Sequence, residues 1–133
     1  MQLTGPCVQV LIGLASSMVQ TLTQNGQTVP VPQAGRALID TGASITCIDD
    51  DLAKKLGLPV LDVVQMVSAS HTTPANVYPV QIEVVGVGIS VQVLRCMGAK
   101  LSQQGIAALI GRDFLVNGLL VYNGVVGAIT LSF

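Results

Sequence analysis

The chain of 133 residues is poor in charge and in aromatic side chains: 10% of its residues are charged, it has no tryptophan, and it has a single histidine. Disordered segments and nucleic-acid-binding surfaces need more charge than this. The formal net charge of −1 also provides no attraction for a polyanion. We therefore expect no nucleic-acid partner. One histidine leaves little material for a metal site or for histidine-activated nucleophiles, so we expect no metal and no cofactor.

The sequence also lacks a long apolar run. Mean hydropathy is +0.68, yet the best candidate, Cys7–Val19, is interrupted by Gln9 and by Ser16 and Ser17 and falls short of the roughly 20 residues of a membrane helix. No basic segment followed by an apolar stretch marks a signal peptide. We expect no membrane partner.

Cysteine is scarce as well. The three cysteines are odd in number and show no CxxC spacing, which argues against a disulfide framework and against zinc. Free thiols suit a reducing compartment, so the cytoplasm is favoured over the cell exterior, although the sequence does not fix the location.

What the chain does have is apolar residues, half of the total, in short runs separated by turn residues. This pattern is typical of an all-β fold, and the length suits a single domain over residues 1–133. A helix is expected where three acids, Asp49–Asp51, precede Leu52–Leu56, with the acids on a solvated face. The segment Ser16–Pro32 is expected to be a polar connection with a turn at Asn25-Gly26. The predicted strands are Val8–Leu14, Ala37–Asp40, Val60–Val67, Val77–Val85, Ile89–Met97, Ile106–Ile110, Leu119–Tyr122 and Ala128–Phe133.

The first motif with chemical content ends a fully apolar strand: Ala37-Leu38-Ile39-Asp40-Thr41-Gly42-Ala43-Ser44. On its own, Asp-Thr-Gly also fits a simple turn in which the aspartate caps the backbone and glycine supplies an unusual dihedral angle. The tripeptide occurs once in the chain.

A second motif, Leu109-Ile110-Gly111-Arg112-Asp113-Phe114-Leu115, lies downstream. The two together resemble the retropepsin-like aspartic proteases, which combine an apolar strand ending in Asp-Thr/Ser-Gly-Ala/Ser with an apolar strand entering a Gly-Arg-Asp/Asn helix. The resemblance implies a closed, barrel-like acid protease fold with one or two short helices. It also implies an aspartic endopeptidase acting on a peptide or protein substrate.

The resemblance implies a role for each residue of the first motif. Asp40 is the catalytic carboxylate. Because each chain has one such motif and the chemistry uses two carboxylates around a water, the second Asp40 must come from a symmetric homodimer. Thr41 would link the two loops, and Gly42 would allow close backbone approach. Ala43 and Ser44 would line the substrate.

Two features depart from the family. The hairpin around residues 66–78, expected to join its strands through Ser68–Asn76, corresponds to the flap that closes over substrate, but no glycine occurs between Gly57 and Gly86. Ser70, His71 and Thr72 at its tip are the expected substrate contacts. His71 is otherwise a loop residue without a role.

The second departure concerns Gly111, Arg112 and Asp113, the structural support implied by the resemblance. The family's usual acidic partner for the arginine is absent, since Ser44-Ile45 stands there. Arg112 must then bind a backbone carbonyl or an acid of the other subunit.

Three functions therefore remain open. The first is an active homodimeric aspartic endopeptidase with a preference for apolar substrates, and the second is a catalytically silent domain of the same fold used for dimerisation or peptide binding. A phosphotransferase with Asp40 as nucleophile is disfavoured, because no second acid for magnesium and no phosphate-binding loop are present.

Overall fold

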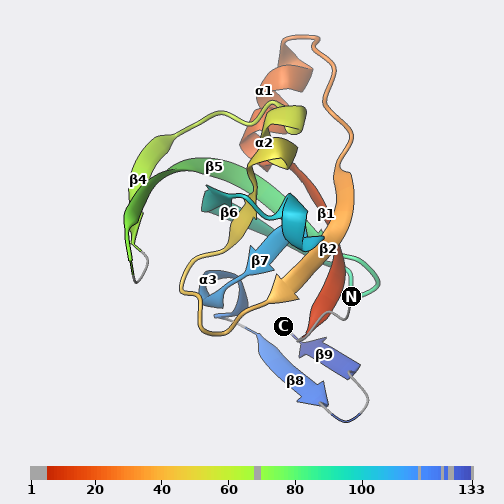
Figure 1. Ribbon diagram of the computed structural model, residues 1–133. Helices are drawn as coiled ribbons and strands as arrows, with labels where there is room; N and C mark the ends of the chain where they lie inside the picture. The colour runs from red at the N-terminus through yellow and green to blue at the C-terminus, as the bar shows by residue number, and fades with distance from the viewer. Residues whose placement is uncertain (1–5, 68–69, 117, 124, 126–127, 133) are drawn as a thin grey trace.

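The strands of the computed structural model, which describes residues 6–67, 70–116, 118–123, 125 and 128–132, form a closed barrel (Figure 1). Strand order around it is β1-β2-β7-β3-β6-β5, and a β1–β5 pairing closes the ring, while β4 extends the sheet beyond β5. The strands are β1 (Cys7–Leu14), β2 (Gln33–Ile39), β3 (Cys47–Asp49), β4 (Asp62–Val67), β5 (Thr72–Val84), β6 (Ile89–Ala99) and β7 (Ala108–Ile110). The expected all-β, barrel-like fold is thus confirmed.

The barrel interior is filled by alternate residues of its strands, as the two-residue period of a β-strand requires. On β1, Val10 and Ile12 are fully buried, while the intervening Leu11 lies half-buried on the outer face. On β5, Val80 and Ile82 continue the same core. This apolar interior provides the rigid scaffold on which the loops at the strand ends are held.

The first half of the segment Ser16–Pro32, expected to be a polar connection, forms a helix, α1 (Ser16–Gln24), which was not predicted from the sequence. Met18, Val19 and Leu22 recur at helical spacing and pack against the core cluster, which outweighs the low helix propensity of the serines and threonines. Asn25-Gly26 does form a turn, but it ends the helix: Asn25 N–H donates to Thr21 O, and Gly26 has a φ of 70°.

The expected helix after the three acids is present as α2 (Asp50–Leu56), and Gly57 ends it in a left-handed conformation. The expectation that its acids form a solvated face was wrong. Asp49 is 6% exposed and caps the helix, because its carboxylate accepts from Leu52 N–H. Asp50 is half-buried and accepts from the hydroxyl of the buried Tyr78. Asp51 alone of the three is exposed.

The hairpin predicted between residues 60 and 85 is formed by β4 and β5, but its tip is shorter than expected. Strand β5 begins at Thr72, with Val67 paired to Thr72, so Thr72 and Pro74 lie in a strand. Residues 68 and 69 of the expected tip lie outside the described residues. Figure 1 shows the hairpin curving away from the barrel as an arm.

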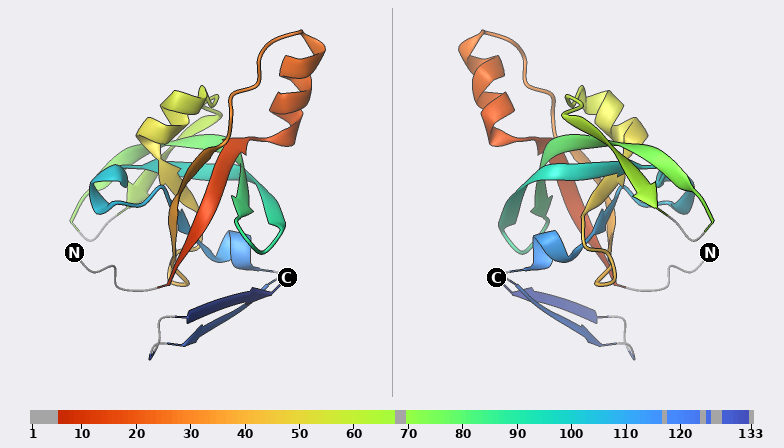
Figure 2. Two further views of the ribbon diagram at one scale, coloured as in Figure 1. Left: turned by 90° about the vertical axis from the view of Figure 1, so that its right-hand side faces the viewer. Right: turned by 90° about the vertical axis from the view of Figure 1, so that its left-hand side faces the viewer.

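The remaining elements belong to the C-terminal part of the chain. A 3₁₀ turn, η1 (Ser102–Gln104), precedes β7, and a short helix, α3 (Arg112–Leu115), follows it as predicted. Strands β8 (Leu119–Asn123) and β9 (Ala128–Ser132) pair with each other as a separate two-stranded sheet, which Figure 2 shows below the barrel. None of the described helices has the length and apolar character that a membrane crossing requires.

Candidate active site

The two sequence motifs meet because β2 and β7 are parallel neighbours. Their register pairs Leu38 with Leu109 and Ile39 with Ile110, so both strands end at the same edge of the barrel. Asp40 and Gly111, the next residue of each strand, therefore leave the sheet side by side. Asp40 N–H donates to Ile110 O over 2.9 Å, which fixes the start of the loop.

Asp40 heads a tight turn at this edge. One of its carboxylate oxygens, Oδ1, accepts from Gly42 N–H over 3.0 Å, and its carbonyl accepts from Ala43 N–H over 3.1 Å. Asp40 and Ala43 are half-buried, whereas Thr41, Gly42 and Ser44 are exposed. The turn geometry thus holds the carboxylate at the molecular surface rather than in the core.

Arg112 braces this turn through the backbone. Its guanidinium Nη1 donates to Thr41 O over 2.8 Å, and its own N–H donates to Ala43 O over 2.8 Å. Of the two acceptors expected for Arg112, the backbone carbonyl is the one observed within the chain. An uncharged acceptor replaces the missing acid, and the contact with the Asp40 loop is kept.

Thr46 is the buried centre of the support, and sequence reasoning missed it. Its side chain is fully buried; its hydroxyl donates to Asp113 Oδ1 over 2.6 Å and accepts from Gly111 N–H over 3.1 Å. Its own N–H donates to both Asp113 oxygens over 3.0 Å. A threonine among β-branched residues has the sequence pattern of an ordinary strand residue. No feature of the neighbouring sequence therefore predicted these hydrogen bonds.

Gly111 is required by the close approach of the two loops. A Cβ at this position would lie 2.8 Å from the carbonyl carbon of Ile45 and 3.0 Å from Ala43 O. These neighbours are backbone atoms, which cannot rotate away. The glycine of the second motif therefore allows the two motifs to touch. Arg112 contacts the Asp40 loop directly, whereas Asp113 contacts Thr46.

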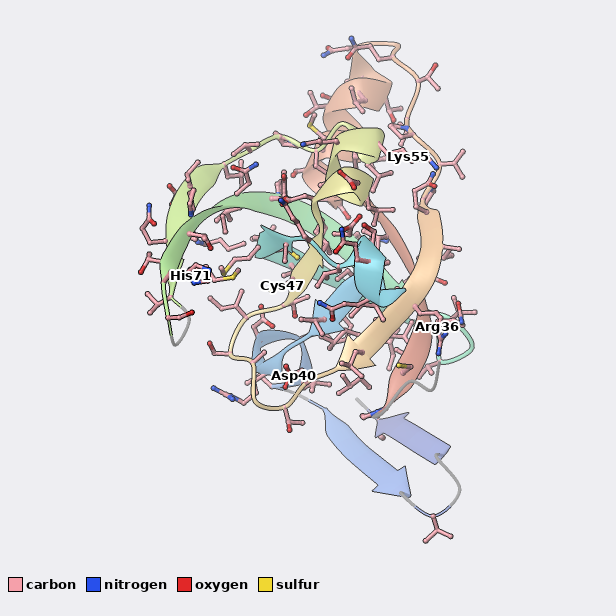
Figure 3. All side chains as sticks on the ribbon, viewed as in Figure 1. Arg36, Asp40, Cys47, Lys55 and His71 are labelled. Atoms are coloured by element: carbon pink, nitrogen blue, oxygen red, sulfur yellow. The ribbon has the colours of Figure 1, made fainter. Side chains whose placement is uncertain are left out.

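Cys47 begins β3 just beyond this network and is half-buried (Figure 3). Burial raises the pKa of its thiol, and the negative charges of Asp113 and Asp40 raise it further. Cys96 on β6 is fully buried, and burial holds the pKa of its thiol well above the usual value of 9.0. Both groups therefore stay protonated at neutral pH.

The expected substrate contacts on the hairpin lie apart from Asp40 within one chain, as Figure 3 shows for His71. Ser70, His71 and Thr72 are exposed, and Ser70 Oγ lies 3.0 Å from His71 Nδ1. Figure 3 shows the His71 side chain on the concave side of the hairpin, the side that faces the barrel. Within one chain, the Asp40 loop and the β4–β5 hairpin are thus separate from each other.

The described residues contain no group of three or more His, Cys, Asp or Glu side chains that could hold a metal ion. The chemical groups gathered at the edge of β2 and β7 are the Asp40 carboxylate, its backbone donors and the Arg112 guanidinium. A carboxylate is a group that can act as a general acid or base.

Comparison with known families agrees with this geometry. Residues 20–117 match the family model described as gag-polyprotein putative aspartyl protease. The chain belongs to this family of retropepsin-like aspartyl proteases. The matched range includes the Asp40 loop, the β4–β5 hairpin and the Gly111–Asp113 support. No curated protein matches the chain.

Proposed function

We propose that this retropepsin-like domain is an aspartic endopeptidase that works as a homodimer, with one Asp40 from each subunit. The observation that carries the proposal is the position of Asp40: a half-buried carboxylate at the surface end of a central strand, held by Gly42 N–H and braced by Arg112. A purely structural aspartate needs no exposed Asp-Thr-Gly loop with a second motif built around it.

The chemistry needs two such carboxylates. Two carboxyl groups that share one site cannot both ionise readily, so one stays protonated and the pair titrates as a unit. The ionised Asp40 accepts a proton from the attacking water, while the protonated Asp40 donates a hydrogen bond to the peptide carbonyl. A two-fold axis beside the Asp40 loops would bring the two groups together through the same surface on both subunits.

The neighbours of Asp40 have supporting roles in this proposal. Thr41 is exposed and would bind across the two-fold axis, and the Gly42 carbonyl would accept from the substrate backbone. Ala43 and Ser44 would line the cleft. The β4–β5 hairpin would close over the peptide, with Ser70, His71 and Thr72 at or near its tip, and so exclude water from the reaction.

The direct test is peptide cleavage. Wild-type protein incubated with a mixed peptide library at mildly acidic pH should cut internal peptide bonds, and Asp40→Asn should abolish cleavage, since the amide is neither a base nor an ionisable partner. Asp51→Asn, which removes an exposed carboxylate of α2, is the matched control and should cut normally. Equal cleavage by wild type and Asp40→Asn would exclude the proposed mechanism.

The glycine-free hairpin and the replacement of the acidic partner of Arg112 by a backbone carbonyl support one alternative, a silent domain that dimerises or binds peptides. The same library separates the two functions. A dimer that binds peptides and leaves them intact after long incubation is the result that would establish the alternative.

A further inference from the structure

A recess lies outside the barrel, far from the Asp40 loop. A half-open cavity of about 430 Å³ is bordered by α1, the segment 29–32 and the outer faces of β1 and β5. Ligand sites for small molecules have volumes of roughly 300 to 1,000 Å³, so the size is sufficient. Figure 2 shows α1 and the segment after it standing out from the end of the barrel above β1. Most of the lining is apolar and includes Leu11, Leu14, Val19, Val29, Pro30 and Pro32.

The walls of this cavity are tied together. Ser16, the first residue of α1, donates from its N–H to Gln92 Oε1 over 2.9 Å and from its hydroxyl to Gln81 Oε1 over 3.3 Å. Gln92 Nε2 also donates to Gln81 Oε1, over 2.6 Å. On the other side Pro32 packs over Gly13, where a Cβ would lie 3.3 Å from the proline ring. The site is therefore formed before any ligand binds, which lowers the entropic cost of binding.

One charged residue lines the cavity, and it is the carboxylate of Glu83. Glu83 is half-buried on β5 and lies opposite Leu11 of β1 in the register of the two strands. The salt bridge found among the described residues joins Arg95 to Asp62 and does not involve Glu83. None of the described hydrogen-bond donors contacts the Glu83 side chain.

Helix α1 and the segment that follows it cannot neutralise the charge of Glu83. No charged residue and no histidine precedes Arg36 in the chain, so α1 and the segment after it carry no cation. Arg36 itself lies opposite Gln9, and Figure 3 shows it on β2 well below α1. Within the described part of the protein, the Glu83 carboxylate beside these apolar walls forms no salt bridge.

We propose that this cavity is a binding site for a small organic cation, a primary ammonium or guanidinium group on an apolar body. The apolar walls would bury the hydrocarbon body, and Glu83 would accept a charge-assisted hydrogen bond from the cationic group. An anion of the same shape would be repelled. The site does not depend on proteolysis, since none of its residues touches the Asp40 loop.

The test uses three ligands of one shape: cyclohexylmethylamine, cyclohexylmethanol and cyclohexanecarboxylate, each titrated into ¹⁵N-labelled protein of residues 1–133 at neutral pH. The amine should shift amide signals of residues 11–20, 29, 31 and 81–83, and it should bind about tenfold more tightly than the alcohol, with the carboxylate weakest. Three equal affinities, no binding by the amine, or shifts centred on residues 40–44 would each overturn the proposal.

A pair of variants isolates the charge. Glu83→Gln keeps the size and shape of the side chain, so the alcohol should bind as before while the advantage of the amine over the alcohol falls to about twofold or less. Asp51→Asn removes a carboxylate outside the cavity and should leave that advantage unchanged. If both variants reduce it equally, the amine is responding to overall charge and the site is not specific. Cleavage by either variant is a separate measurement, so failure here leaves the protease proposal standing.

Discussion

At the scale of single residues, the Asp40 loop depends on side chains that do not take part in the chemistry. Thr46, Gly111 and Asp113 form a closed set of hydrogen bonds beneath the loop, and Arg112 reaches over it to Thr41 O. Because buried polar groups are costly when unpaired, the loss of one member should affect the whole set.

Two substitutions of Thr46 distinguish the contribution of its hydroxyl to stability from that of its side-chain volume. Thr46→Val keeps the volume but leaves Gly111 N–H and the Asp113 carboxylate each short of a partner, and should lower the free energy of unfolding by about 1–3 kcal/mol. Thr46→Ser keeps the hydroxyl, loses one methyl group and should cost about 1 kcal/mol. Urea unfolding at equal protomer concentration measures both values. If Thr46→Val were as stable as wild type, the hydrogen bonds of the Thr46 hydroxyl would not stabilise the protein.

The buried thiols make stability sensitive to alkali. The pKa of Cys96 is raised by burial, first of all, and then by Cys47 and Asp113, so the folded protein holds the proton where the unfolded chain releases it. Their stabilisation is complete below the unfolded pKa near 9.0 and is lost as pH rises above it, by at most about 1.4 kcal/mol per pH unit for each thiol.

Unfolding free energies at pH 8 and pH 10 test this expectation. Wild type should be less stable at pH 10, and Cys96→Val should show a smaller difference between the two pH values, whatever its stability at pH 8. A variant with the same pH dependence as wild type would mean that Cys96 does not titrate on unfolding.

At the scale of elements, α2 is anchored at its start by one buried carboxylate. Asp49 Oδ2 accepts from Leu52 N–H, and Oδ1 accepts from the N–H groups of Leu101 and Ser102 over 3.0 Å each. One side chain thus caps α2 and fixes the entry to η1. The contacts join two segments that are far apart in the sequence.

Asp49→Ala should therefore destabilise the protein by about 1–3 kcal/mol, because it removes the helix cap and leaves buried N–H groups unpaired. Asp51→Ala, in the same helix but exposed, should cost less than about 1 kcal/mol, since it loses only an interaction with the helix dipole. Chemical denaturation of the two variants side by side is the measurement. Equal losses of unfolding free energy in the two variants would show that the helix cap and the buried contacts of Asp49 add no stability beyond the effect of a negative charge near the helix start.

At the scale of the whole molecule, the proposed activity belongs to the dimer. When wild type and Asp40→Asn protomers are mixed in equal amounts and allowed to exchange, random pairing leaves about half of the wild-type protomers in wild-type dimers. Cleavage per wild-type protomer should fall to about half. Unchanged cleavage per wild-type protomer after complete exchange, followed by native mass spectrometry, would mean that one chain is sufficient.

The elements that could be predicted are those with a local signal. The alternating strands, the acid-headed helix α2 and the helix after Gly111 all carry periodicity or capping residues in their own segments. Helix α1 was missed because Ser, Thr and Gln dominate it, and its three apolar side chains gain their stability from packing on the barrel. Strand β3 was missed because three residues, Cys47–Asp49, are too short to show a period.

The sequence by itself determined most of the barrel-forming strands and the two motifs, since an apolar strand followed by Asp-Thr-Gly and one followed by Gly-Arg-Asp can be recognised from their own residues. Only the tertiary structure decided how these parts support one another. The parallel pairing of β2 with β7 brings Gly111 beneath the Asp40 loop, buries Thr46 between them and gives Arg112 the carbonyl of Thr41. The physical reason is that hydrogen bonds between distant segments depend on strand register, which no single segment of the chain encodes.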